Sequence, residues 1–537
     1  MASDSRVINF ALVTDKLADH AGAFQNLDEL RGELQKTSFQ ENSDTGTSAG
    51  LVFEDLHMEN SLRTRDNQLF FLVQVGSRPE VELLRDAQKA LNTSNPAHQI
   101  ESRRIAYEAR RVRADGGFTG AAEMITDTVH WNALYSPEQK RTFVVDSRRW
   151  FLPDSWTLFG NSAILSAWAA ALESKQLAED TFRATMAEQL PDGRVMNAAG
   201  EMVTTPDRSQ DMYAAYVAWK IYLKWGDQQF LREEYPRIKA WHDWWFADRG
   251  DGQPWRDGNR DGLLELGSNL SPFDATQAAP DGEEYGLHHQ AAMWEAFDDS
   301  PMWGWYQKGI SVHPSIYRGE ENVQYVFRTG TLNLNTAPTN ALWALSADML
   351  AQIAHELGYR QDERHFRDEY QQIKTRINET LWDEKTGMYL NRFWAEAGGN
   401  FSYRKSPALL WMMAAGIPSE AQARRLVYEH LLNPKEFWGD FVLPSISRDD
   451  PAFPEQYYWR GTIWPPLNYF VYEGLKRYGY DDVAAELADR TYRLVKTNWD
   501  KTGALWENYN SITGEGNAHG AGGSTKHYAW SAALPLL

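Results

Sequence analysis

The feature that most restricts how this chain can fold is a pair of helical segments that recurs along the sequence. Three of the pairs cover residues 209–245, 340–383 and 468–500. In each pair, a segment with apolar residues near i, i+3 and i+4 spacing is followed by a more charged, amphipathic one. The glycines that end the first segments are Gly226, Gly358 and Gly479. Glycine readily adopts the left-handed conformation that closes a helix, so these positions predict helix C-caps.

Two further pairs of the same design occupy residues 161–190 and 405–432. Pro465 and Pro466 predict the start of a helix, because its first turn tolerates proline. An apolar inner helix paired with an amphipathic outer helix, repeated about six times, predicts a mainly α protein built as an (α/α)6 barrel. Neighbouring hairpins would cover each other's apolar faces in that barrel. An open helical solenoid made of the same hairpins is the alternative.

The N-terminal part of the chain has a different pattern. Residues 6–13, 50–58 and 68–76 are apolar segments with the character of strands. Three strands are too few for a stable sandwich, so we expect them to pack against the helical body. The predicted organisation is an N-terminal β-rich segment over residues 1–78 and an (α/α)6 barrel catalytic domain over residues 79–537.

Charge and residue usage exclude several classes of function. The chain has 54 Lys and Arg against 74 Asp and Glu, which gives a formal net charge of −20. Such a charge repels polyanions, so nucleic acid and anionic membranes are not expected partners. The absence of Cys excludes disulfides, thiol catalysis and Cys-ligated zinc. We see no secretory signal and no apolar stretch of about 18 residues, so a cytoplasmic protein is expected. The sequence does not indicate whether the protein is a monomer or an oligomer.

Acidic residues lie among aromatic ones in two segments of the expected barrel. One is residues 293–305, MWEAFDDSPMWGW, and the other is residues 506–510, WENYN. Glycoside hydrolysis needs one protonated carboxyl and one carboxylate, and apolar rings favour the protonated form of a nearby acid. This composition alone leaves two interpretations open, a hydrolytic site or acids without a catalytic role.

Four longer segments carry a resemblance to a known family. Residues 129–150, 295–303, 458–479 and 506–516 resemble sequence blocks of glycoside hydrolase family 63 and its relatives, in the family's order. The group includes processing α-glucosidase, mannosylglycerate hydrolase and glucosylglycerate hydrolase. The resemblance covers roughly residues 120–537. It implies an (α/α)6 barrel and hydrolysis with inversion of anomeric configuration.

The resemblance also implies catalytic residues. Asp298 in DDSP matches the general acid and Glu507 in WENYN matches the general base. The family usually places a Glu four residues before the acid, whereas Glu295 precedes Asp298 by three. Counting from Glu295 would select Asp299 instead. We assign the acid to Asp298, because the residues that follow it match without a gap.

Further residues are assigned to the sugar site. The family's early Trp-Asp pair is replaced here by Asp154, or by Asn161 if GNSA stands for WDSA. Arg460 would donate to ring hydroxyls or position a carboxylate, and aromatic rings would stack on the sugar. The other residues assigned to substrate binding are Gln189, Trp294, Asp299, Trp459, Gly461, Trp464, Trp506 and His527.

A loop that begins like a calcium site follows the helical pair of residues 209–245. Its residues with side-chain or backbone oxygens in ligand positions are Asp257, Asn259, Asp261, Leu263 and Glu265. The twelfth position is Ser268 rather than Glu, which excludes an EF-hand. Two interpretations of this loop stay open, a hydrogen-bonded Asx turn and a site for a structural calcium ion. No cofactor is expected for catalysis.

These observations favour one function over its alternatives. The predicted protein is an inverting, exo-acting α-glycosidase, specifically an α-glucosidase for a short α-glucoside or one with a small aglycone. Its partner is a small carbohydrate. Mannosylglycerate or glucosylglycerate hydrolysis is the first alternative. A sugar 2-epimerase and a non-catalytic sugar-binding protein on the same toroid are the others.

Overall fold

The computed structural model separates into two compact units, Met1–Arg111 and Val112–Leu537. It describes residues 9–14, 20–24, 48–52, 71–76, 80–93, 95–114, 116–148, 156–200, 209–210, 212–267, 325–326, 328–451, 453–456, 461–516 and 524–536. The boundary predicted at 78/79 falls before two helices that the structure assigns to the first unit.

The first unit combines two antiparallel strand pairs with helices. β1 pairs with β4 from Asn9 opposite Gly76 to Thr14 opposite Phe71. β2 pairs with β3, and α2 contacts β1 and β4. The described elements are β1 (Asn9–Thr14), β2 (His20–Phe24), β3 (Ser48–Val52), β4 (Phe71–Gly76), α2 (Glu80–Thr93) and α3 (Pro96–Arg110). Three of these strands overlap the predicted segments, and β2 is an addition.

The second unit is mainly helical, as the sequence predicted. Its described α-helices are α4 (Ala121–Trp131), α5 (Gly160–Ala170), α6 (Lys175–Met186), α7 (Ala214–Trp225), α8 (Gln228–Trp244), α11 (Ala337–Leu357), α12 (Arg360–Thr380), α13 (Trp411–Ala414), α14 (Glu420–Arg425), α15 (Pro465–Arg477) and α16 (Asp481–Thr502). Its single-turn and irregular helices are η2 (Gly116–Phe118), η5 (Ala395–Ala397), η6 (Pro407–Leu410), η7 (Leu426–Leu431), η8 (Phe453–Glu455) and η10 (Ala529–Leu536).

Short antiparallel strand pairs lie in the connections between the helices of this unit. The pairs are β5 (Ala133–Ser136) with β6 (Arg141–Val144), β7 (Thr157–Phe159) with β8 (Ala198–Gly200), β9 (Tyr325–Val326) with β10 (Thr331–Leu332), β11 (Leu334–Asn335) with β14 (Arg392–Phe393), and β12 (Trp382–Asp383) with β13 (Met388–Tyr389).

Two of the three predicted glycine C-caps are confirmed. Gly226 and Gly358 are left-handed C-caps of α7 and α11, with φ of 71° and 78°. The C-cap of α15 is Tyr478, and the predicted Gly479 follows it with φ of 74°. α15 begins at Pro465, as the two prolines predicted. α8 follows α7 at once because the Asp227 side chain caps it, accepting hydrogen bonds from the backbone N–H groups of Gln229 and Phe230.

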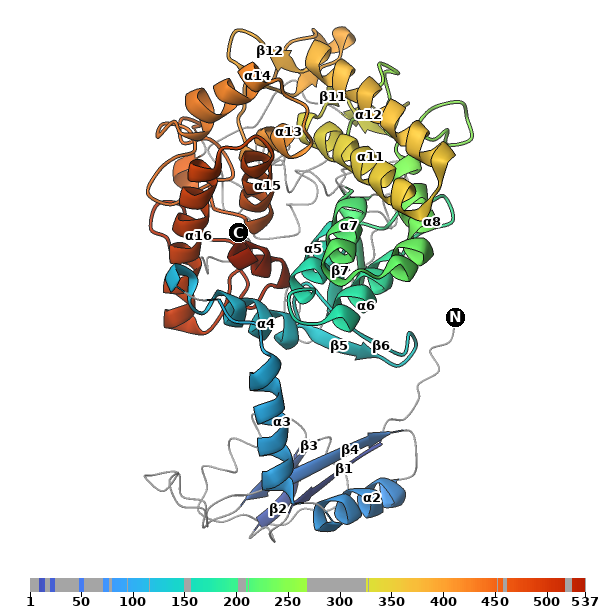
Figure 1. Ribbon diagram of the computed structural model, residues 1–537, viewed down its shortest axis with the longest axis vertical. Coiled ribbons are helices and arrows are strands. Elements are labelled where there is room, and N and C mark those ends of the chain that lie inside the picture. The colour runs from blue at the N-terminus through green and yellow to red at the C-terminus, as the bar shows by residue number, and fades with distance from the viewer. Residues whose placement is uncertain are drawn as a thin grey trace. The chain divides into compact units, whose positions relative to one another are not determined.

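The inner helices contact one another in a closed cycle. Among the described residues, the contacts run from α5 to α7, α11, α13 and α15, then to η10, and from η10 back to α5. The helices α6, α8, α12, α14 and α16 lie outside them in Figure 1. The inner and outer helices also differ in burial. Most of α11 is buried, whereas α12 buries Phe366, Tyr370, Ile373 and Ile377 at helical spacing.

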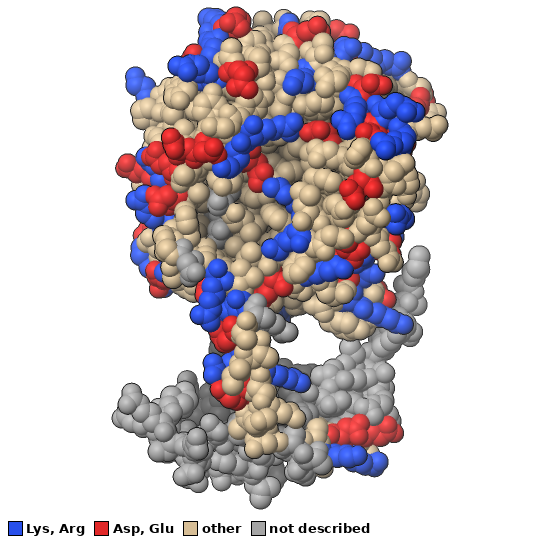
Figure 2. Space-filling view, viewed as in Figure 1, with Lys and Arg blue, Asp and Glu red and all other residues tan. Residues whose placement is uncertain are grey.

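Two connections from outer helices to the next inner helices contact each other. The backbone N–H of Trp394, after α12, donates to the carbonyl of Asn333, before α11. Within the stretch between α8 and α11, the N–H of Leu332 donates to the carbonyl of Leu266. Of the two acid-containing segments, residues 506–510 follow α16, and residues 293–305 lie outside the described residues. None of the helices in the described ranges combines the length and apolar character of a membrane span. On the described residues of the face shown in Figure 2, acidic and basic side chains are interspersed.

Candidate active site

Glu507 lies in a connection that begins where α16 ends at Gly503, a residue with φ of 65°. Its side chain is 2% exposed. One carboxylate oxygen, Oε2, accepts a hydrogen bond of 3.1 Å from the backbone N–H of Thr525. The backbone N–H of Glu507 donates in turn to the Thr525 carbonyl at 2.8 Å. Thr525, which the sequence did not predict as part of the site, therefore fixes the carboxylate.

Three indole rings surround this carboxyl-bearing segment. Trp464, Trp506 and Trp530 are all buried. The Trp530 Nε1–H donates to the backbone carbonyl of Glu507 at 3.3 Å, and its ring packs edge-on against Trp464 with 5.5 Å between centroids. The structure thus brings the predicted residues Trp464, Trp506 and Glu507 together. A dry, aromatic setting strengthens electrostatic interactions with a bound substrate.

The segment that contains Gly461 pairs with the segment that contains Glu507. Ile463 and Tyr509 exchange two backbone hydrogen bonds of 2.7 and 3.0 Å. Gly461 has φ of 97°, a left-handed conformation, and its N–H donates to the Ser445 hydroxyl at 3.0 Å. The two sequence blocks are therefore neighbours in space, although they are far apart in the chain.

His527 follows the strand-like partner of the Glu507 segment. Its ring lies 4.9 Å from the half-exposed Trp131 at the end of α4, and its carbonyl accepts a hydrogen bond from the Asn132 side chain. Burial, with a smaller contribution from the charge of Lys526, lowers the pKa of His527. Its backbone φ of 56° is uncommon for a residue other than glycine. Trp131 lies in the first of the segments that resemble the family, residues 129–150, and its ring packs against that of His527.

Several predicted residues lie outside the described residues. They are Asp154, Trp294, Asp298, Asp299, Trp459 and Arg460. Asn161 lies in the first turn of α5. Gln189 lies in the turn after α6, where its amide nitrogen donates to the carbonyls of Gly193 and Arg237 at 2.7 and 2.8 Å. Substrate binding by Gln189 stays a prediction.

The predicted calcium loop gathers three carboxyl groups. Ligand oxygens of Asp257, Asp261 and Glu265 lie within 4.8 Å of one another. Asp257 Oδ1 is buried without a hydrogen-bond partner, and among the described residues no Lys or Arg forms a salt bridge with these carboxyls. Burial and the charge of Asp261 raise the pKa of Asp257 to about 6, and burial raises that of Glu265. A cation would relieve this unfavourable concentration of negative charge.

The other predicted ligands have defined roles in the same loop. The Asn259 side chain donates to Asp261 Oδ2 at 2.9 Å and accepts from the Asp261 N–H at 3.1 Å. The N–H of Leu263 donates to Asp261 Oδ1 at 2.9 Å. Glu265 accepts hydrogen bonds from the Gly258 N–H and the Trp394 indole, at 2.6 and 3.1 Å. The Asx turn is thus present, and it leaves the acidic oxygens clustered.

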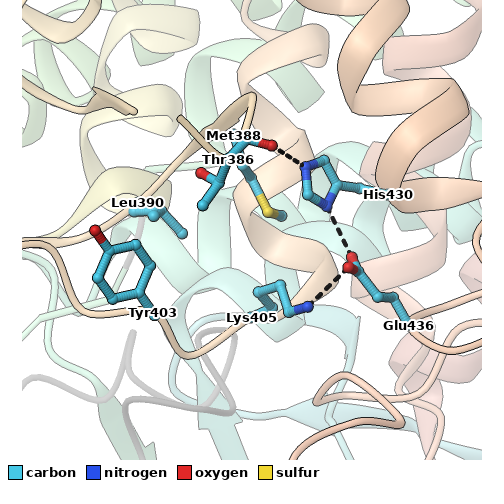
Figure 3. Close-up of a pocket in the computed structure, with 7 residues that line it drawn as sticks. All are labelled: Thr386, Met388, Leu390, Tyr403, Lys405, His430 and Glu436. Carbon is cyan, nitrogen blue, oxygen red and sulfur yellow. Dashed lines mark hydrogen bonds and ion pairs between the residues drawn. The ribbon is translucent and has the colours of Figure 1, made fainter. Parts of the chain in front are cut away.

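A separate cavity of about 270 Å³ opens between the turn after α12 and η7. Figure 3 shows apolar side chains on one side and an ionic network on the other. Glu436 accepts hydrogen bonds from Lys405 at 2.7 Å and from His430 at 2.8 Å. The lining residues are Thr386, Met388, Leu390, Tyr403, Lys405, His430 and Glu436. With one carboxyl, already paired, this cavity lacks the two acids that hydrolysis requires.

Residues 157–531 match the family model of the mannosylglycerate hydrolase MGH1-like glycoside hydrolase domain. A mannosylglycerate hydrolase of Thermus thermophilus is 32% identical over 162 residues, which is 30% of this chain and 35% of that protein. A mannosyl-oligosaccharide glucosidase of Saccharomyces cerevisiae is 27% identical over 31% of this chain and 22% of its own length. The chain thus matches about a third or less of these curated relatives.

Solved structures give a longer match. Two structures are of a GH63 mannosylglycerate hydrolase from Thermus thermophilus, one with glucose and one with Tris and D-glycerate. Each aligns over 77% of this chain and 98% of the solved chain, with 20% identity and a TM-score of 0.56. At this identity the match demonstrates a shared fold.

Proposed function

Because the chain belongs to the mannosylglycerate hydrolase MGH1-like family of glycoside hydrolases, we propose that it hydrolyses an α-glycoside with a small aglycone. The observation that carries the proposal is the position of Glu507. This carboxylate matches the family's general base, is 2% exposed, and is held by Thr525 among Trp464, Trp506 and Trp530. The closed cycle of inner-helix contacts supports an (α/α)6 barrel as its scaffold.

In the proposed mechanism, Glu507 activates water and Asp298 protonates the leaving oxygen. Inversion requires the two carboxyl groups to lie roughly 6.5–9.5 Å apart, so that a water molecule fits between Glu507 and the anomeric carbon. Trp459, Trp464 and Arg460 bind the sugar ring. The enzyme is exo-acting, because it removes the terminal sugar of its substrate. The hydrogen bond from Thr525 to Oε2 fixes the orientation of the Glu507 carboxylate. The carboxylate that takes the proton from water is therefore held in one position.

Two substrate classes fit this site. A glycoside of glycerate is supported by the family match and by the mannosylglycerate hydrolase relative. Arg460 would pair with the glycerate carboxylate, because a guanidinium forms charge-assisted, bidentate contacts with carboxylates. A short α-glucoside is supported by the glucosidase relative. We place the enzyme in the cytoplasm and expect neither nucleic acid nor membrane as a partner.

We also propose a structural calcium ion at Asp257, Asp261 and Glu265. Hard oxygen donors suit calcium, and the ion would pair with three carboxyls that form no salt bridge with a described Lys or Arg. A second acidic site of the same unit supports this reasoning. There Asp449 and Glu436 are bridged by the ammonium of Lys405, from another segment, at 2.8 and 2.7 Å. The calcium ion has no part in the hydrolysis.

The proposed activity is tested with a panel of mannosylglycerate, glucosylglycerate, glucosylglycerol and α-linked disaccharides, followed by NMR of the product anomers. We expect free sugar with inverted configuration. An epimerase would instead convert one free sugar into its 2-epimer, and a sugar-binding protein would leave every compound unchanged. Either outcome would refute the proposal.

Three variants assign the catalytic roles within this test. Asp298→Asn should abolish turnover of natural glycosides and spare much activity on glycosyl fluorides, whose departure needs little protonation. Glu507→Gln should inactivate both reactions, because water must still be activated. Asp299→Asn should weaken both together through lost binding. If fluoride hydrolysis survives in Asp299→Asn and is lost in Asp298→Asn, the acid is Asp299.

A further inference from the structure

Gln456 combines an unusual backbone with a buried side chain. Its φ of 48° lies in the left-handed region, and it is 6% exposed. A non-glycine residue in that region costs energy and persists only where its surroundings demand it. Gln456 ends the turn that begins with η8, and residues 457–460 follow it directly. The position therefore requires a specific explanation.

The carboxamide of Gln456 uses its full hydrogen-bonding capacity. Its Nε2 donates to the carbonyls of Phe453 and Gly461 at 2.9 and 3.3 Å. Its Oε1 accepts from the backbone N–H and the hydroxyl of Ser511, at 2.8 and 3.2 Å. An amide has two donors and two acceptor lone pairs, and all four are occupied. One side chain thus joins three segments of the chain.

The joined segments are those that the catalytic proposal needs. Gln456 and Gly461 are the two ends of the stretch that contains Trp459 and Arg460, and Ser511 follows Glu507 by four residues. The fit at Gly461 is close, because an added Cβ would lie 2.5 Å from Gln456 Nε2. Two residues after Gly461, Ile463 forms backbone hydrogen bonds with Tyr509, which also lies in the Glu507 segment. The Gln456 amide therefore ties Gly461 to Ser511, in the segment that follows Glu507.

We propose that Gln456 is a positioning residue for hydrolysis, which holds the segment from Gly461 to Trp464 against the segment of the general base. The inference rests on the proposed function and assigns Gln456 no contact with substrate. A displacement of about 1 Å at a reacting group can lower a rate on the order of 100-fold, so a clamp of this kind affects kcat. The left-handed backbone aims the amide at all three partners.

The test is Gln456→Glu, which keeps the shape and removes both amide donors. Its control is Asn378→Asp in α12. Asn378 also makes four hydrogen bonds, from Tyr389 and Gln422 and to Lys374 and Ile417, but joins outer elements of the unit. Both variants should lower the melting temperature. Gln456→Glu should lower kcat roughly 10- to 100-fold with KM changing less, and Asn378→Asp should leave kcat within about twofold.

An unchanged kcat in Gln456→Glu, beside a loss of stability like that of Asn378→Asp, would overturn the proposal. If Gln456→Glu does not fold, the variant Ser511→Ala tests the proposal instead. It removes one hydroxyl contact and should lower kcat several-fold at a native melting temperature, and an unchanged kcat would refute the clamp.

Amide hydrogen exchange separates failure of this inference from failure of the proposed function. Gln456→Glu should speed exchange at Ile463 and Tyr509 together, whereas Asn378→Asp should not. A wild-type chain inactive on the whole glycoside panel would refute the function while leaving this measurement valid. Unchanged exchange at Ile463 and Tyr509 would refute the clamp whether or not the chain is active.

Discussion

At the scale of single residues, Asp146 has the titration with the clearest consequence. It is fully buried, its Oδ2 accepts a hydrogen bond from the Phe159 N–H at 2.5 Å, and its carbonyl accepts one from Ala529 at 2.7 Å. Burial raises the pKa of Asp146 from 3.8 to about 7. Between these two values the folded state holds a proton that the unfolded state has released. The stability that protonated Asp146 contributes is therefore lost as the pH rises through about 7.

We expect Asp146→Asn to remove this dependence, because the amide resembles the protonated acid. The free energy of unfolding of the variant, relative to the wild type, should rise by about 3 kcal/mol between roughly pH 5 and pH 8. Urea unfolding at intervals over that range measures it. Asp227→Asn is a control of opposite sign. The hydrogen bond from Lys175 lowers the pKa of Asp227. The stability that ionised Asp227 gives the wild type is therefore lost only as the pH falls. A flat difference for Asp146→Asn would contradict the expectation.

At the scale of elements, the sequence predicted what local pattern determines. Glycine C-caps and the alternation of apolar and amphipathic helices placed α7, α8, α11, α12, α15 and α16. η10 was not predicted, since its eight residues have no helical repeat long enough to recognise. β2 and the helices α2 to α4 were also missed. In the site, the WENYN block identified Glu507, but Thr525 and Gln456 act through contacts between distant segments, which sequence spacing does not contain.

The loop after α8 allows a prediction about calcium. Calcium should raise the melting temperature by several degrees near pH 7.5, more than magnesium, because three clustered carboxyl oxygens would share the ion. The effect should shrink near pH 5, since burial raises the pKa of Asp257 to about 6 and protons then compete. Scanning calorimetry with calcium or with a chelator measures it.

The matched variants for calcium are Asp261→Asn and Asp449→Asn. Asp261→Asn removes a carboxyl of the calcium loop and should abolish the calcium effect. Asp449 is paired with the Lys405 ammonium, so Asp449→Asn should keep the effect. Equal responses of the two variants, or no response of the wild type, would rule out this site.

At the scale of the whole molecule, the two units differ in what they supply to the site. The described contacts that close the inner cycle, from α5 round to η10, all lie in Val112–Leu537. So do the segments around Gly461, Glu507 and Thr525 that meet at the candidate active site. A compact unit with its own core is expected to fold alone. We therefore expect the second unit to hold Glu507 in this arrangement when it is produced alone.

Two deletions test this difference. Removal of residues 1–111 should leave the helical circular dichroism and the hydrolytic activity per molecule of the second unit, with a melting temperature within about 5 °C of the full chain's barrel transition. Removal of residues 525–537, although much shorter, should abolish activity and cooperative unfolding. It takes away η10, which closes the inner cycle between α15 and α5, and Thr525, whose N–H fixes the Glu507 carboxylate. A folded, active chain after the short deletion would show that the second unit does not need η10 or Thr525, and an aggregating chain after the long deletion would show that it does not fold alone.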